Sequence, residues 1–243
     1  MSGHSHAKTI KHQKELTDKK RGQIFSKMAR VILVAVKKGG TDPDTNSQLR
    51  LAIETAKKVN MPKENVERAI KRAAGEGAEE SFEEISFDAY GPGGIALIIE
   101  GITDNKNRTL GEIKQILNQH NGKLASEGSV KWLFNKLGVI IINSREQASE
   151  IKKEDLELKA IEAGADDTYW HDDSLDIYMK PEDLEKVKKN LEEKGIKIDS
   201  TSLDLVAKEE ITLGGGEKAA CEKLFDALDE NDSVQEIYSN LKE

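Results

Sequence analysis

The sequence contains a single cysteine, Cys221, which lies in the segment EKAACEKLFDALDE. Apolar residues recur in this segment at helical spacing, at Ala220, Leu224, Phe225 and Leu228. We therefore expect a reduced, partly buried thiol on the apolar face of a helix. No histidine is predicted to lie nearby, which argues against a catalytic cysteine.

Long apolar runs are also missing. The longest uninterrupted one is VILVAV, residues 31–36, whereas a helix needs about 20 apolar residues to cross a bilayer. The basic start of the chain is followed by no apolar export segment, and Glu15 and Asp18 make it a poor transit peptide. These features predict a cytoplasmic protein without a membrane partner.

Motifs that carry catalysis are absent as well. The sequence has no HExxH, GxSxG or CxxC, and its glycine clusters at 91–94 and 214–216 lack the Lys-Ser/Thr ending of a phosphate-binding loop. His171, Asp172 and Asp173 coincide with an expected hairpin turn, which we favour over a metal site. We expect no enzymatic activity, no cofactor and no catalytic residue.

Aromatic residues are scarce and unevenly placed. Of eleven in the chain, only Phe25 precedes Gly75, and it adjoins an expected core stripe. The first part of the chain thus lacks a platform for stacking bases, which argues against single-strand binding of that kind. The later part has no RNP-like run, and its acidity would repel RNA.

Charge is divided along the chain, whose net charge is -8. Up to Gly75 there are 17 Lys plus Arg and 7 Asp plus Glu, and the remainder has 20 and 38. A segregated basic segment is typical of a protein that binds a polyanion, although a solvated charged face is the simpler alternative. We favour nucleic acid as the partner.

Residues 1–22 are expected to form a flexible basic arm. Lys8, Lys11 and Lys14, together with the histidines at 4, 6 and 12, could bind phosphates and become ordered on nucleic acid. Without Met1, Ser2-Gly3-His4 would also suit square-planar Cu(II) or Ni(II), so His4 is a weak metal candidate. We favour phosphate binding and assign no metal site.

Residues 23–75 show the periodicity of three amphipathic helices. The helices span about 23–38, 49–59 and 62–75, with Gly39–Gly40 and Gly75 as stops. Cations lie outside the apolar stripes, and Arg68, Lys71 and Arg72 share one helical surface, although Glu64 and Glu67 could pair with them as ordinary helix neighbours. This region is the predicted nucleic-acid-binding domain.

The rest of the chain is predicted to form two ferredoxin-like α/β domains, one inserted in the other. After the acidic linker 75–81, strand periodicity begins, and SVKWLF, residues 129–134, is expected to be a strand. Residues 138–206 read strand, helix, strand, strand, helix, strand, with the middle strands at DTYWH (167–171) and SLDIYMK (174–180). Residues 82–137 plus 207–243 would form the surrounding domain. The expected fold class is α+β, with an N-terminal three-helix basic bundle.

Several motifs resemble the YebC/PmpR family, whose mitochondrial relatives are translational activators of cytochrome c oxidase. They are GHS, IKH, DKKRGQIFSKMAR, GGTDPDTN, LRLAIETAKKVNMPKENVERAIKRAAG and YGPGGIALIIE, and the resemblance extends over essentially the whole chain. It implies a basic helical bundle followed by two α/β domains, one inserted in the other, without enzymatic activity. Members are described as DNA-binding transcriptional regulators, and some as ribosome-associated factors that relieve stalling at proline-rich stretches.

The sequence departs from the family pattern at His6, Ala7, Gln13 and Gln48, where the family commonly has three cations and one tryptophan. The resemblance carries over the binding surface best at Lys11, His12, Lys14, Lys19, Lys20, Arg21 and Lys27. With the cations placed by periodicity, the candidate nucleic-acid-binding residues are Lys8, Lys11, His12, Lys14, Lys19, Lys20, Arg21, Lys27, Arg30, Arg50, Lys57, Arg68, Lys71 and Arg72.

The predicted function is that of a non-enzymatic nucleic-acid-binding regulator of gene expression. A DNA-binding transcriptional regulator is favoured, and a ribosome-associated translation factor bound to ribosomal RNA is the alternative. Phosphate contacts carry no base information, so the residues alone favour neither. A protein partner could bind the acidic α/β domains.

Overall fold

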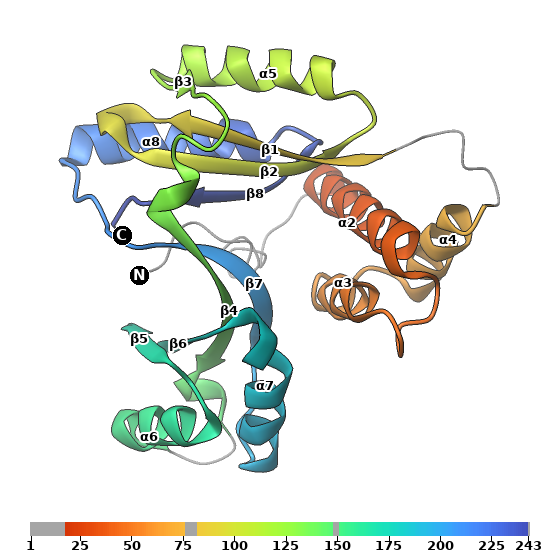
Figure 1. Ribbon diagram of the computed structural model, residues 1–243, viewed down its shortest axis with the longest axis vertical. Coiled ribbons are helices and arrows are strands. Elements are labelled where there is room, and N and C mark those ends of the chain that lie inside the picture. The colour runs from red at the N-terminus through yellow and green to blue at the C-terminus, as the bar shows by residue number, and fades with distance from the viewer. Residues whose placement is uncertain (1–17, 76–81, 148–150, 243) are drawn as a thin grey trace. The chain divides into compact units, whose positions relative to one another are not determined.

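The computed structural model describes residues 18–75, 82–147 and 151–242. The chain forms two compact units. The first consists of the described residues before 133 together with those after 210, and the second consists of residues 133–210. The fold class is α+β: a helical part is followed by two mixed α/β parts, each with a four-stranded antiparallel sheet (Figure 1). No helix within the described ranges is long and apolar enough to span a membrane.

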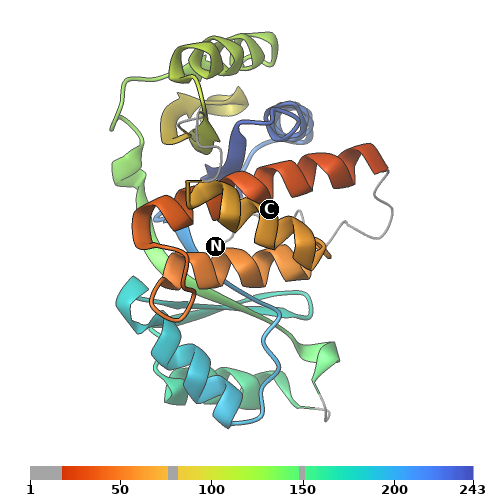
Figure 2. The same cartoon turned by 90° about the vertical axis from the view of Figure 1, so that its right-hand side faces the viewer.

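The first unit begins with three helices, α2 (Asp18–Gly39), α3 (Ser47–Lys58) and α4 (Lys63–Ala73), which Figure 2 shows facing the viewer. One side of α2 contributes Met28, Ile32 and Val36 to a core shared with α3 and α4. Gly40 ends α2 with a φ of 85° and donates its N–H to the Val36 carbonyl oxygen at 2.8 Å. The asparagine at 46 caps α3.

Helix α2 starts earlier than the periodicity indicated. We expected residues 1–22 to be a flexible arm and the helix to begin at 23, but residues 18–22 belong to α2. The segment DKKRG has no apolar residue, so hydrophobic periodicity cannot detect this first turn. Residues 1–17 lie outside the described part of the chain.

The same unit contains the first sheet. Strands β1 (Glu83–Tyr90), β2 (Ala96–Thr103), β3 (Lys123–Leu124) and β8 (Val234–Ser239) pair in the order β3-β1-β2-β8. Helices α5 (Lys106–Gln119) and α8 (Gly215–Asp229) share one core with Phe87, Leu97 and Ile99, so both cover the same face of this sheet. Gly101 lies at an irregularity of the β2–β8 pairing, close to Ser233.

The strand order of this first sheet differs from the ferredoxin-like arrangement that we expected. Its elements follow the order ββαβ and then αβ, with the β1–β2 hairpin at the centre of the sheet. A ferredoxin-like unit is βαββαβ. The pairing of β3 and β8 with the two sides of this hairpin joins segments distant in sequence, which a local pattern does not specify.

The second unit does have the ferredoxin-like element order. It comprises β4 (Phe134–Asn143), α6 (Lys153–Ala163), β5 (Asp167–His171), β6 (Ser174–Met179), α7 (Leu184–Glu193) and β7 (Ser200–Ala207). Its strands pair in the order β5-β6-β4-β7, and α6 and α7 share a core with Ile140, Leu175 and Ile177. The unit extends a few residues beyond the expected 138–206 at both ends. The expected strand 129–134 is instead a 3-10 turn, Lys131–Leu133, followed by β4.

Candidate nucleic-acid interface

Helix α4 presents the clearest basic surface among the described residues. Val66 and Ala69 are buried against the bundle, whereas Arg68, Lys71 and Arg72 are exposed. The helical period of 3.6 residues places these three cations on the outer side of the last two turns. Cations in a last turn also interact favourably with the helix dipole, which is a structural reason for their presence.

The outer side of α4 is not uniformly basic. Glu64 and Glu67 are exposed in its first half, and Lys63 lies 3.4 Å from Glu67. Arg68 donates to Asn65 Oδ1 at 2.6 Å, which holds its guanidinium along the helix. The half of α4 nearest Ala73 is therefore the part that can attract phosphate.

Helix α3 ends close to the start of α4. Lys57 and Lys58 are exposed in its last turn, and residues 59–62 connect the two helices, with Asn60 at a φ of 57°. A short turn between two helices is characteristic of the helix-turn-helix motif, in which the second helix approaches the nucleic acid. Arg50, at the other end of α3, is half-buried, and its Nη1 lies 3.4 Å from the Pro43 carbonyl oxygen.

The candidates on α2 fall into two groups. Lys20 and Arg21 are exposed in its first turn. Lys27 is buried: its Nζ donates to Asp229 Oδ1 at 3.0 Å and to the Asp229 carbonyl oxygen at 2.6 Å. The Lys27 charge is therefore bound within the chain, by what we call the α8–β8 loop, residues 229–233, which includes the last residue of α8.

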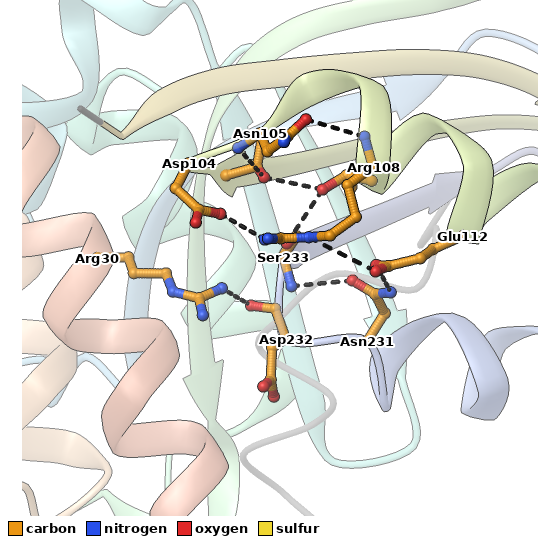
Figure 3. A network of polar contacts seen from close by, with 10 residues as sticks. Arg30, Asp104, Asn105, Arg108, Glu112, Asn231, Asp232 and Ser233 are labelled. Carbon is orange, nitrogen blue, oxygen red and sulfur yellow. Dashed lines mark hydrogen bonds and ion pairs between the residues drawn. The ribbon is translucent and has the colours of Figure 1, made fainter. Parts of the chain in front are cut away.

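Arg30 contacts the same loop. Its Nη1 donates to the Asp232 carbonyl oxygen, and its guanidinium lies 5.6 Å from the centre of the Phe82 ring (Figure 3). Further along α2, Lys38 Nζ lies 2.5 Å from Glu84 Oε2, at the start of β1. Lys27, Arg30 and Lys38 thus connect α2 to the part of the unit that carries the first sheet.

A polar network holds this loop in place (Figure 3). Asn231 donates to Glu112 Oε2 and accepts from the Ser233 N–H, both at 2.9 Å. Arg108, on α5, has its Nη2 2.5 Å from Asp104 Oδ1 and its Nε 3.7 Å from Glu112 Oε1. The Arg108 hydrogen bond lowers the pKa of Asp104, and the more distant Arg30 charge adds to this effect. The Asp232 carbonyl that Arg30 meets therefore belongs to a loop held by hydrogen bonds.

Several candidate residues lie where the structure permits no description. Lys8, Lys11, His12, Lys14 and His4 lie outside the described residues, and the Lys19 side chain is likewise outside them. The predicted binding residues did not include Lys58 and Lys63, which are exposed near the described candidates Lys57 and Arg68. Their position in a helical turn beside other cations could have identified them.

Cys221 and the aspartates of the β5–β6 turn, which the sequence singled out, have structural roles in the described part of the chain. Cys221 is buried, its Sγ lies 3.5 Å from the Pro92 carbonyl oxygen, and burial raises the pKa of this thiol. Asp172 occupies the β5–β6 turn with a φ of 50°, and Asp173 pairs with Arg145 at 2.5 Å. Within the described ranges, no group of three or more His, Cys, Asp or Glu side chains could hold a metal ion.

Family models match nearly the whole chain. The model of the TACO1/YebC protein N-terminal domain matches residues 5–76, and that of the TACO1/YebC second and third domain matches residues 82–241. The boundary between the two matches falls between α4 and β1. The family models thus separate the helical part from both sheets.

Curated relatives and a solved structure agree with this match. Probable transcriptional regulatory proteins of Thermoanaerobacter pseudethanolicus and Persephonella marina are 45% and 46% identical over 242 and 244 residues. These matches cover 100% of this chain and 97% and 96% of the relatives. The crystal structure of a conserved hypothetical protein from Aquifex aeolicus matches with a TM-score of 0.86 and 40% identity, over 96% of this chain and 95% of that one. The chain belongs to the TACO1/YebC family.

Proposed function

We propose that this protein is a non-enzymatic regulator of gene expression that binds nucleic acid through its helical part, and that duplex DNA is the target. The observation that carries the proposal is the exposed cluster Arg68, Lys71 and Arg72 on α4, beside Lys57 at the end of α3. The relatives named as probable transcriptional regulatory proteins support a regulatory role.

The charge distribution supports binding through the helical part rather than through the sheets. Residues 18–75 contain 14 Lys plus Arg against 6 Asp plus Glu, whereas the residues from 76 onwards are strongly acidic. Phosphates are attracted to the first part and repelled by the second. The acidic remainder would limit non-specific adhesion to nucleic acid and could contact a protein partner.

A ribosome-associated translation factor is the second candidate, and the acids on α4 favour it. A recognition helix contacts bases with its N-terminal residues, but the exposed residues there include Glu64 and Glu67. These carboxylates oppose close approach to phosphates at the position where sequence would be read. Contacts of α4 to backbone phosphates alone would suit folded RNA as well as DNA.

The decisive experiment compares Arg68→Ala/Lys71→Ala/Arg72→Ala with the unsubstituted protein. Each phosphate contact contributes about 0.9 to the slope of log affinity against log salt on B-DNA. We expect the slope to fall by about two to three units when all three cations are removed. Fluorescence anisotropy with a labelled 30-base-pair duplex, at several salt concentrations, measures it.

The matched control is Lys136→Ala/Lys186→Ala/Lys189→Ala, which removes three exposed lysines from the 133–210 unit. An equal loss of slope in the control would show that overall charge, rather than the α4 surface, binds DNA. Sedimentation with ribosomes after nuclease removal of DNA separates the two candidates. If the α4 substitutions abolish this sedimentation and leave the salt slope on DNA unchanged, the DNA regulator is excluded.

A further inference from the structure

We propose that the α8–β8 loop and the start of β1 form an autoinhibitory latch. Their anionic groups bind cations of α2, and these cations bind nucleic-acid phosphates when the latch opens. The proposal rests on the proposed function, because it concerns the regulation of nucleic-acid binding by the helical part. Two ion pairs carry it, Lys27 with Asp229 and Lys38 with Glu84.

The latch acceptors resemble phosphate in their chemistry. Lys27 Nζ is bound by one carboxylate oxygen and one carbonyl oxygen of the same residue, and Arg30 donates to the neighbouring Asp232 carbonyl. Lysine and arginine make the same charge-assisted hydrogen bonds to phosphate oxygens. Exchange of the loop for a phosphate backbone would therefore preserve the hydrogen bonding of these cations.

The burial of Lys27 also favours a contact that can open over one that only stabilises the fold. The Lys27 side chain is 9% exposed and that of Asp229 is 52% exposed, so the lysine is largely desolvated in the contact. The cost of desolvating a charge offsets most of the attraction within such a pair, which leaves a small net stabilisation. A competing polyanion can displace a contact of this kind.

The bundle can separate from the loop without losing its own core. Met28, Ile32 and Val36 pack against residues of α3 and α4, whereas the buried Leu33 and Val34 of α2 are not part of that core. Once released, Lys27 and Arg30 would join the cations that are already exposed, Lys38 among them. The basic surface available to nucleic acid would then be larger than the one in the closed arrangement.

The test compares Asp229→Asn/Glu84→Gln with a control of equal charge change, Asp226→Asn/Glu83→Gln. The control residues are exposed on the same two elements, α8 and β1. We expect the latch variant to bind a 30-base-pair duplex several-fold more tightly than the control, with a salt slope steeper by about one to two units, since each gained phosphate contact adds about 0.9.

A second measurement follows the movement of α2 itself. Spin labels at Ser26→Cys on α2 and Asn107→Cys on α5, both exposed, should shift to longer distances when the duplex is added. Equal affinity and slope in the latch variant and the control, with unchanged label distances, would overturn the latch while leaving the proposed function standing. If the unsubstituted protein and both variants all fail to bind nucleic acid, the proposed function itself is wrong.

Discussion

Helices α2 and α4 come from the same basic stretch of sequence, yet Lys27 of α2 and the cations of α4 are in opposite environments. Helix α2 packs against α3 and α4 on one side and meets the α8–β8 loop on the other, so Lys27 is buried and paired. Helix α4 buries Val66 and Ala69 against the bundle, and Lys71 is exposed. The number of cations on a helix therefore does not determine how many of them a ligand can reach.

The comparison also separates two roles for a positive charge. A buried lysine must keep its partner, because an unpaired charge in a desolvated site is costly. An exposed lysine contributes little to stability and remains available to a polyanion. We expect substitutions on α2 to change the stability of the first unit, and substitutions on α4 to change binding.

The largest effect on stability should follow Gly101→Ala, which disturbs the loop that α2 contacts. A Cβ at Gly101 would lie 2.2 Å from the Ser233 carbonyl oxygen, which accepts the Ile102 N–H at 2.8 Å. The loop that carries Asp232 must shift to relieve the overlap. We expect the free energy of unfolding of the first unit to fall by about 2–3 kcal/mol, measured by urea denaturation with circular dichroism.

Gly111→Ala is the matched control for this substitution. Gly111 is exposed within α5, and a Cβ there would meet nothing within 4 Å. Alanine in a helix interior is favoured over glycine by about 0.5–1 kcal/mol, so this variant should be more stable. A Gly101→Ala protein as stable as the original would show that the loop is not held at Ser233.

We expect an intermediate loss of stability from Lys27→Met on α2. Lys71→Met is the corresponding substitution on α4. Lys27→Met removes two hydrogen bonds to Asp229 and should lower the free energy of unfolding by about 1.5 kcal/mol. Lys71→Met should change it by less than about 0.5 kcal/mol. Urea denaturation of both variants measures the difference, and equal values would contradict the division between α2 and α4.

The smallest effect concerns the pH dependence of the loop network. The Arg108 hydrogen bond lowers the pKa of Asp104 below its ordinary 3.8. A carboxyl whose pKa is lower in the folded state stabilises the protein above its unfolded pKa, and this contribution is lost as the pH falls through the folded pKa. Since the pair is partly exposed, we expect a contribution below about 1 kcal/mol.

Asp104→Asn tests this expectation. The difference in stability between the original protein and the variant should be present at pH 7 and decline below about pH 4. Urea denaturation at pH 7, 5 and 3 follows it. A difference that stays constant over this range would indicate that shape rather than charge sets the role of Asp104.

Local patterns predicted much of the fold, and particular elements show why. Helical apolar periodicity predicted the three helices of the basic part, because each of them buries one side of itself. The residue pattern also predicted strands at 167–171 and 174–180, which are β5 and β6, although all six residues of β6 are buried. Periodicity missed the first turn of α2, where no apolar residue marks the buried side. It also predicted a strand at 129–134, but residues 131–133 form a 3-10 turn and β4 begins at Phe134.

The sequence alone determined the separation of charge, the order of the elements and the motifs that place the chain in its family, since these depend on residue types and on spacings of a few residues. The tertiary structure decided the strand order β3-β1-β2-β8 and which cations of α2 are bound within the chain. Lys27 and Asp229 are 202 residues apart. No local pattern encodes that pairing, because it arises only when the chain brings α2 to the α8–β8 loop.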